Sequence, residues 1–520
     1  MFSYFLAKGS FNHVYKERYS ESYYHAIAEK DKIFKITLVI SAFLSMIFLD
    51  QTAVGVTLAS IQKELVLSAS TIAWIMNAYM ITLSAFLLLF ARLSDSIGIK
   101  NLFCAGILIF LLASLGCAVS NSGAGLIINR GLQGIGASMG YATYLLIFNN
   151  QVPANKRGKV LGTSAAFAAV FLALGPLIGG FFSNVISWRY LFWLNVPICL
   201  VCFYFAISAC NKDSHPVNHA FLDKLGLLIY LFAMTGLIFF LMEGPTLGWT
   251  NPAILISLIS SLLFFTLFVY HEKRQRQPLI EMVLFKNKEF FASVLILFGN
   301  YACITIMAFW ALWIEQVLGY SPLMTGVALL PAGVPYILTS RIGGALYDRY
   351  GPRLPLLIGS ILFLVGLIEM ALVATSLQYL WFLVGMLLVG LGWGFVRPCA
   401  ILSSLHSVAA PQKSMATGVI STMRQLGAAV GFALVYAVIS TYQHFSLLSI
   451  IQRYQLNLST SQLNYLMTHS HQPHPLTYLI PLVNTVRTRG FSLGLLVISS
   501  LALLNLVLAI KYLKASPQNS

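Results

Sequence analysis

Residues 91–100 read Ala-Arg-Leu-Ser-Asp-Ser-Ile-Gly-Ile-Lys, and residues 344–353 read Gly-Ala-Leu-Tyr-Asp-Arg-Tyr-Gly-Pro-Arg. A small residue, a leucine, an aspartate, a glycine and a basic residue recur at identical offsets in these two stretches, 253 residues apart. A second pair lies 252 residues apart, since Gly175-Pro-Leu-Ile-Gly179 matches Gly427-Ala-Ala-Val-Gly431. These echoes predict two structurally similar halves that follow one another in parallel along the chain.

The composition around these stretches excludes most classes of soluble protein. Of 520 residues, 58% are hydrophobic and 9% are charged. A water-soluble globular protein carries roughly 25% charged residues, so a soluble fold of this size could not cover its surface. The composition therefore argues against a cytosolic enzyme, a disordered chain and a nucleic-acid-binding module, and it predicts a polytopic membrane protein.

Apolar stretches of about 20 residues are long enough to cross a bilayer as helices, and lipid favours helices because it cannot satisfy open backbone groups. We count fourteen of them. Their approximate limits are 36–61, 71–93, 102–119, 124–148, 159–183, 191–210, 221–241, 252–270, 289–315, 323–346, 355–375, 379–404, 414–440 and 490–511. The repeats then relate spans 1–6 to spans 9–14 and leave spans 7 and 8 as an insertion.

The basic residues orient the chain. With an even number of spans, the side that holds both termini receives 24 Lys and Arg residues and the opposite side receives five. This bias predicts cytoplasmic termini in a cell inner membrane or plasma membrane, and it explains the net charge of +16 without nucleic acid. The predicted organisation is a cytoplasmic N-tail (1–35, unlike a cleavable signal peptide), a six-helix bundle (36–210), two inserted helices with linkers (211–288), a second six-helix bundle (289–511, with an external loop at 441–489) and a C-tail (512–520).

The cysteines and histidines do not indicate a disulfide framework, a metal site or a proton relay. All seven cysteines lie in or beside apolar segments and read as packing residues, so we expect no disulfide framework, metal site or cofactor. All ten histidines fall outside the predicted spans, which argues against a histidine proton relay and against a membrane-embedded acyltransferase. No phosphate-cradling Gly-x-x-x-x-Gly-Lys-Ser/Thr loop is present, so energy is expected from an ion gradient.

Four motifs in register carry a family resemblance. They are Leu49-Asp50-Gln51-Thr52 in span 1, the loop at 91–100, Arg130-x-x-Gln133-Gly134-x-Gly136 in span 4, and Gly175-Pro176-x-x-Gly179-Gly180 in span 5. The chain resembles the major facilitator superfamily, in particular its fourteen-span drug:proton antiporter group. The resemblance implies an all-α fold of two six-helix bundles with two inserted helices, and a secondary transporter rather than an enzyme. Gly55, Thr57, Ala59, Ala91 and Ser96 depart from the group's usual residues, which bears on substrate specificity and on the loop's charge network.

Three charged residues within spans are candidates for proton coupling. Asp50 lies midway along span 1, where an ionised carboxylate costs about 2.5–3.5 kcal/mol, and a carboxyl group that alternates between neutral and ionised forms can carry a proton. Arg130 in span 4 needs a carboxylate or backbone carbonyls as partners, and the resemblance links it to proton transfer. Glu369 in span 11 is a second intramembrane carboxylate that no motif covers. For each, a purely structural role is the alternative.

The other candidate residues are expected to gate or seal the two halves or to line a substrate pocket. Residues expected to gate or seal the two halves are Asp95, Gly98, Lys100, Gln133, Gly134, Gly175, Pro176, Gly179, Gly180, Asp348 and Arg349. Residues expected at a substrate pocket are Arg424, Tyr141, Trp310 and Trp313, with weaker support for Arg397. Either arginine could meet an anionic ligand, with a packing ion pair as the alternative, and for the aromatic residues the alternative is packing or a place at the membrane interface.

The favoured function is proton-coupled efflux of amphipathic or cationic small molecules by alternating access, with the lipid bilayer, a small-molecule substrate and protons as partners. Two alternatives stay open. One is a transporter of the same fold with a dedicated substrate, such as a siderophore or metabolite, and possible inward transport. The other is a non-transporting membrane sensor.

Overall fold

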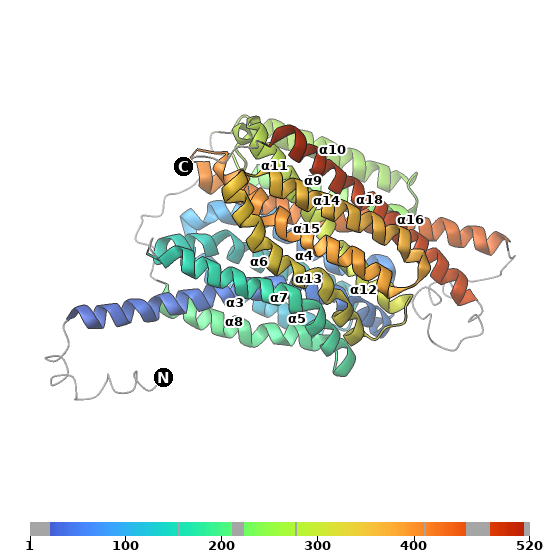
Figure 1. The fold of residues 1–520 in the computed structure, drawn as a ribbon, viewed down its shortest axis with the longest axis horizontal. Helices are drawn as coiled ribbons and strands as arrows, with labels where there is room; N and C mark the ends of the chain where they lie inside the picture. The colour runs from blue at the N-terminus through green and yellow to red at the C-terminus, as the bar shows by residue number, and fades with distance from the viewer. Residues whose placement is uncertain are drawn as a thin grey trace.

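The computed structural model in Figure 1 describes residues 21–153, 156–210, 223–275, 278–409, 412–453 and 479–513. In these ranges the regular elements are all helical. The all-α fold predicted from the sequence is confirmed. The start of α3 (Glu21–Leu65) and the end of α18 (Ile480–Tyr512) lie toward the same end of the molecule (Figure 1), and we call this the terminal end and the other the distal end.

Six helices form the N-terminal half. They are α3 (Glu21–Leu65), α4 (Ala69–Ile97), α5 (Ile99–Val119), α6 (Gly123–Gln151), α7 (Arg157–Val185) and α8 (Arg189–Ala209). The C-terminal half consists of α11 (Lys288–Ile304) continued by α12 (Ile306–Gln316), then α13 (Pro322–Tyr350), α14 (Arg353–Val373), α15 (Tyr379–His406), α16 (Lys413–Arg453) and α18 (Ile480–Tyr512). Short 3-10 turns, η2 (Met282–Lys286) and η3 (Ala374–Ser376), precede α11 and follow α14.

The two remaining helices sit against the side of this pair of bundles. α9 (Lys224–Leu247) packs against α4 of the first half and α16 of the second, and α10 (Pro252–Glu272) packs on α9. α10 is mostly exposed, as expected of a helix that faces lipid. Glu243 on α9 anchors this insertion, since its carboxylate accepts hydrogen bonds from Ser70 at 2.6 Å and Trp74 at 2.7 Å on α4.

The halves meet through corresponding helices, as an internal repeat requires. α7 of the first half packs on α13 of the second, while α16, the repeat partner of α7, packs on α4, the repeat partner of α13. The two repeated loops also share one geometry. Gly98 ends α4 with φ 93° and Gly351 ends α13 with φ 74°, a backbone region that glycine reaches without strain.

Thirteen described helices are long and apolar enough to span a membrane, with α11 and α12 counted as one. The predicted fourth span, 124–148, corresponds to α6, a helix of 29 residues that is less apolar because of its glycines and polar side chains. The predicted ninth span breaks at Thr305, whose hydroxyl donates to the carbonyl of Ala302 at 2.7 Å and competes with the helical ladder.

Several helices extend past the spans predicted from hydrophobicity. α3 begins at Glu21, inside the predicted N-tail, and α16 and α18 continue into the predicted external loop as far as Arg453 and from Ile480. Its remainder, 454–478, which includes His469, His471 and His474, lies outside the described residues. His271, His406 and His444 lie within α10, α15 and α16 but beyond the predicted spans 252–270, 379–404 and 414–440, so the absence of histidines from the spans stays a prediction. Apolar stretches mark the hydrocarbon layer, whereas these helices continue beyond it.

Candidate functional site

The N-terminal half encloses a buried ion pair. Asp50 on α3 and Arg130 on α6 approach to 2.6 Å between Oδ2 and Nη1, and neither side chain is exposed. Arg130 also donates to the Gln133 side-chain oxygen at 2.5 Å and to the carbonyl of Ile75 at 3.3 Å, and its guanidinium lies 4.3 Å from the Tyr79 ring centre. A desolvated pair is stable when further bonds satisfy its remaining polar atoms, and these partners supply most of them.

Gln133 extends the pair to a fourth helix. Its side-chain nitrogen donates to Ser114 Oγ on α5 at 2.9 Å and to Asp50 Oδ1 at 3.4 Å. Tyr79 and Ile75 belong to α4, so α3, α4, α5 and α6 all meet at this cluster. The sequence left open whether a carboxylate or backbone carbonyls would satisfy Arg130. The structure supplies both, and it places the pair inside one half.

Residues next to Asp50 reach the other helices around α3. The Gln51 side chain donates to that of Gln425 on α16 at 3.3 Å, which crosses from one half to the other. Thr52 Oγ1 donates to the carbonyl of Leu172 on α7 at 3.2 Å. The central turn of α3 therefore contacts the ion pair, the neighbouring helix α7 and the opposite half within three consecutive residues.

A second charged cluster lies between the halves. Arg397 on α15 donates to the Tyr301 hydroxyl on α11, and the guanidinium carbons of Arg397 and Arg424 each lie 4.7 Å from the Tyr301 ring centre. Arg397 also lies 5.2 Å from the ring of Tyr336 on α13 and 5.8 Å from that of Phe48 on α3. We call these five residues the arginine cluster. Because Phe48 belongs to the N-terminal half, the cluster spans the boundary.

The arginine cluster differs from the Asp50–Arg130 pair in its charge. In the part of the chain that the structure describes, neither Arg397 nor Arg424 forms an ion pair with a carboxylate. The titratable groups around Arg397 are Tyr301, Tyr336 and Arg424, and Tyr141 and Tyr144 of α6 stand beside Arg424. Two positive charges thus share a largely buried, aromatic environment.

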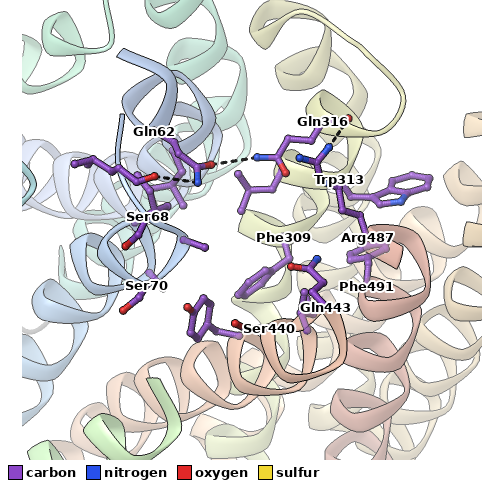
Figure 2. Close-up of a pocket in the computed structure, with 18 of the residues that line it drawn as sticks. Gln62, Ser68, Ser70, Phe309, Trp313, Gln316, Ser440, Gln443, Arg487 and Phe491 are labelled. Carbon is purple, nitrogen blue, oxygen red and sulfur yellow. Dashed lines mark hydrogen bonds between the residues drawn. The ribbon is translucent and has the colours of Figure 1, made fainter. Parts of the chain in front are cut away.

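A cavity of about 580 Å³ opens between the halves at the distal end (Figure 2). Gln62 of α3 and Gln316 of α12 face each other across it and hydrogen-bond at 3.2 Å. Trp313, Phe491 and Arg487 lie on the same side as Gln316, opposite Gln62, and Arg487 donates to the carbonyl of Gln316 at 3.4 Å. This volume falls within the range of small-molecule sites.

The residues predicted at a substrate pocket fall in three places. Trp313 lines the cavity, stacks on Phe491 and donates to Thr488 at 3.2 Å. Trp310 is fully buried against Phe382 and does not line it. Arg424 is a member of the arginine cluster, and Tyr141 lies beside it. Their expected role in binding stays a prediction.

Glu369 does not join the other proton-coupling candidates. It lies on α14, which packs against α13, α15 and α18 of its own half, and it stands next to Gly385 on α15. Its side chain is partly exposed, and α14 does not pack against α3 or α6, the helices that hold Asp50 and Arg130. A role for Glu369 in coupling stays a prediction that the geometry does not connect to the buried pair.

The predicted gating residues of the loops have distinct surroundings. Lys100 Nζ donates to the carbonyls of Ile207 and Cys210 at 2.7 and 2.6 Å, so it caps the C-terminal end of α8. Asp348 and Arg349 are exposed at the end of α13, where Arg349 lies over the neighbouring Tyr350 ring. The side chain of Asp95 lies outside the described residues.

The predicted sealing glycines lie where helices approach closely. A Cβ on Gly175 would stand 1.9 Å from Thr52 Oγ1, and one on Gly179 would stand 2.5 Å from the carbonyl oxygen of Ala53, both on α3. A Cβ on Gly180 would stand 2.2 Å from the carbonyl oxygen of Pro322 on α13, in the other half. α7 is therefore clamped between α3 and α13.

Two further close approaches involve predicted residues. Pro176, within α7, presents its carbonyl oxygen 2.4 Å from where a Cβ on Gly326 of α13 would lie. Gly134 on α6 leaves room for α4, since its Cβ would stand 2.1 Å from Thr82 Oγ1. Small residues at these positions allow backbone contact between helices.

Sequence reasoning missed Tyr301, Tyr336 and the Gln51–Gln425 contact. Tyrosines within apolar spans are common interface and packing residues, so no local pattern marks them. Gln425 adjoins Arg424 in span 13, and two consecutive polar residues in a span were the available signal.

Fold and site together define a polytopic membrane transporter, in which two repeated six-helix bundles enclose a cavity and buried charges. The family model of the Major Facilitator Superfamily matches residues 38–432, and the chain belongs to that family. The resemblance inferred from the motifs is confirmed.

The relatives include drug-resistance proteins. The chain is 27% identical over 404 residues to the multidrug resistance protein Stp of Mycobacterium tuberculosis, covering 77% of this chain and 74% of Stp. It is 29% identical over 410 residues to the methylenomycin A resistance protein of Bacillus subtilis, covering 78% and 87%. The solved inward-facing, unoccupied structure of a bacterial homologue of the human lysosomal transporter Spinster matches with a TM-score of 0.63 at 14% identity, covering 92% of this chain and 98% of that one. At that identity, the likeness concerns the fold.

Proposed function

We propose that the protein is a secondary active transporter that exports amphipathic small molecules in exchange for protons by alternating access. The observation that carries the proposal is the fully buried Asp50–Arg130 pair beside a contact between the halves. The multidrug resistance of its relative Stp supports export of drug-like compounds.

Asp50 is the proposed proton carrier. When ionised it pairs with Arg130, and when protonated it leaves the guanidinium with Gln133, the Ile75 carbonyl and the Tyr79 ring. In the proposed protonated state, these partners would hold Arg130 in place of the carboxylate. The next residue, Gln51, hydrogen-bonds Gln425 on α16. A change of pairing at Asp50 would therefore move a residue that contacts the other half.

The orientation belongs to the same proposal. The bias of basic residues favours cytoplasmic termini in an inner or plasma membrane, so the cavity at the distal end would open to the outside. Alternating access would then close it and open a path at the terminal end. The close helix contacts of α7 with α13, formed through Gly180 and Gly326, are suited to a surface on which the halves rock.

The test is transport by purified protein in liposomes with an imposed pH gradient, with a panel of cationic, neutral and anionic fluorescent dyes. Dye movement should depend on the gradient and stop when a proton ionophore collapses it. Asp50→Asn should lose gradient-driven movement. Asp31→Asn, an exposed carboxylate on the same helix, is the matched control and should retain it. Gradient-driven transport at full rate by Asp50→Asn would refute the coupling role.

A second candidate is a carrier for one dedicated substrate. The relative from Bacillus subtilis is named for resistance to a single compound, methylenomycin A, which favours this possibility. Transport of a single chemical type from the dye panel, with no movement of the others, would select this candidate over a multidrug exporter.

A further inference from the structure

We propose that Arg397 and Arg424, between the halves, bind an anionic group of the transported molecule, such as a carboxylate, sulfonate or phosphate. The inference rests on the proposed transport function and names its substrate class, an amphipathic anion. Of the amphipathic or cationic substrates expected from the sequence, it keeps the amphipathic character and replaces the positive charge by a negative one.

The charge balance of the cluster points to an anion. Both guanidiniums lie against the one Tyr301 ring, and neither has a carboxylate partner among the described residues. Arg397 is 5% exposed, and the Nε of Arg424 is buried without a hydrogen-bond partner. Like charges in a medium of low dielectric repel each other strongly. A bound anion would offset the repulsion between the two guanidinium groups, which no carboxylate among the described residues offsets.

The geometry of guanidinium groups suits this ligand. Each presents several N–H donors in a plane and binds carboxylate, sulfonate or phosphate oxygens through two parallel hydrogen bonds. By contrast, Arg130 already has Asp50, Gln133 and a backbone carbonyl as partners, so it offers little to a ligand. The Asp50–Arg130 pair is thus neutralised internally, whereas the arginine cluster has no carboxylate partner among the described residues.

Aromatic side chains beside the cluster would receive the apolar body of such a molecule. Tyr141 and Tyr144 on α6 stand near Arg424 and pack edge to face, with ring centres 5.6 Å apart. The Tyr141 hydroxyl is buried and has no hydrogen-bond partner among the described residues, so it could donate to a ligand. Charge on one side and aromatic rings on the other match an amphipathic anion.

The cavity approaches the arginine cluster from the distal end without reaching it, and its lining carries charge of the same sign. Among the described residues that line it, Arg487 (Figure 2) is the permanently charged one, and there is no Asp or Glu. Glu315, on the same helix as Gln316 and Trp313, is not part of the lining. The Phe309 and Phe432 rings, 4.8 Å apart, lie at its inner end. Arg424 is eight residues before Phe432 on α16, about 12 Å further in at the rise of an α-helix.

The test compares two probes that differ by a single anionic group. Binding of 1-anilinonaphthalene-8-sulfonate and of its neutral analogue N-phenyl-1-naphthylamine to the purified protein in detergent is measured by equilibrium dialysis. The wild-type protein should bind the sulfonate at least tenfold more tightly than the neutral probe. Equal affinities, or no binding of the sulfonate, would overturn the inference without any variant being needed.

Variants then locate the site. Arg397→Gln and Arg424→Gln should each weaken sulfonate binding about tenfold, equivalent to about 1.4 kcal/mol, and leave the neutral probe unaffected. Arg424→Lys, which keeps the charge but not the planar donor pair, should lose less. Arg341→Gln, an exposed arginine on α13, is the control and should change neither. Equal loss of both probes in the Arg424 and Arg397 variants would refute an anion site.

This experiment separates the inference from the proposed function, since binding in detergent needs no gradient. Selective sulfonate binding without gradient-driven transport would leave the anion site standing and refute proton-coupled export. Gradient-driven transport of a cationic dye by a protein that shows no preference for the sulfonate would do the reverse.

Discussion

Asp50→Asn should be strongly destabilising, and more so than the simultaneous loss of both charged partners. The substitution removes the negative charge that faces Arg130 at 2.6 Å, in a place where neither side chain is exposed. Arginine stays protonated, so an uncompensated charge would remain in the interior. Breaking a buried pair in this way costs about 3–5 kcal/mol. Hydrogen bonds of the asparagine to Arg130 place the expected loss near the lower end.

The double variant Asp50→Asn/Arg130→Gln should lose less than the sum of the two single variants, because it leaves no unpaired charge. The free energy of unfolding is measured by titration with sodium dodecyl sulfate in mixed micelles, followed by tryptophan fluorescence. The matched control is the exposed pair Asp31–Lys35 on the same helix, whose side chains are 54% and 26% exposed. Solvent screens that pair, so its removal should cost at most about 1 kcal/mol. The reasoning would be refuted if the loss in the double variant equalled the sum of the losses in the two single variants, and if each single loss were as small as in the control pair.

Two further substitutions test the packing and the cavity. Gly180→Ala should lower the free energy of unfolding by about 1–3 kcal/mol and slow transport, because its Cβ would meet the Pro322 carbonyl oxygen at 2.2 Å. The control is Gly162→Ala, which has open space around its Cβ and should not destabilise the protein. An equal effect at both glycines in the same titration would contradict this. Trp313→Phe should weaken dye binding in equilibrium dialysis because Trp313 lines the cavity, whereas Trp310→Phe should alter stability and not binding. Weakened binding in both would show that the cavity reaches further than the structure indicates.

The membrane architecture was predictable because it depends on local composition. A bilayer sets the length of an apolar helix, so the described helices follow the predicted stretches, including α6 in spite of its polar residues. The repeat at 91–100 and 344–353 indicated the two halves, and Gly98 and Gly351 occupy equivalent helix ends. The ends of the helices were harder to predict from the sequence. α16 continues to Arg453 because a helix that has left the hydrocarbon layer no longer needs apolar residues.

The sequence by itself determined the class of fold, the family and the presence of charged residues at membrane depth. What only the tertiary structure decided is which of those charges meet. Asp50 lies 80 residues from Arg130 and finds it as its partner, while Glu369 does not approach the pair, and Arg397 and Arg424 come together around Tyr301 without a carboxylate. Hydrophobicity along the chain specifies that a segment is buried, but not which face of a helix meets which neighbour. That choice depends on how the helices of both halves pack, through contacts such as those of Gly175 and Gly180.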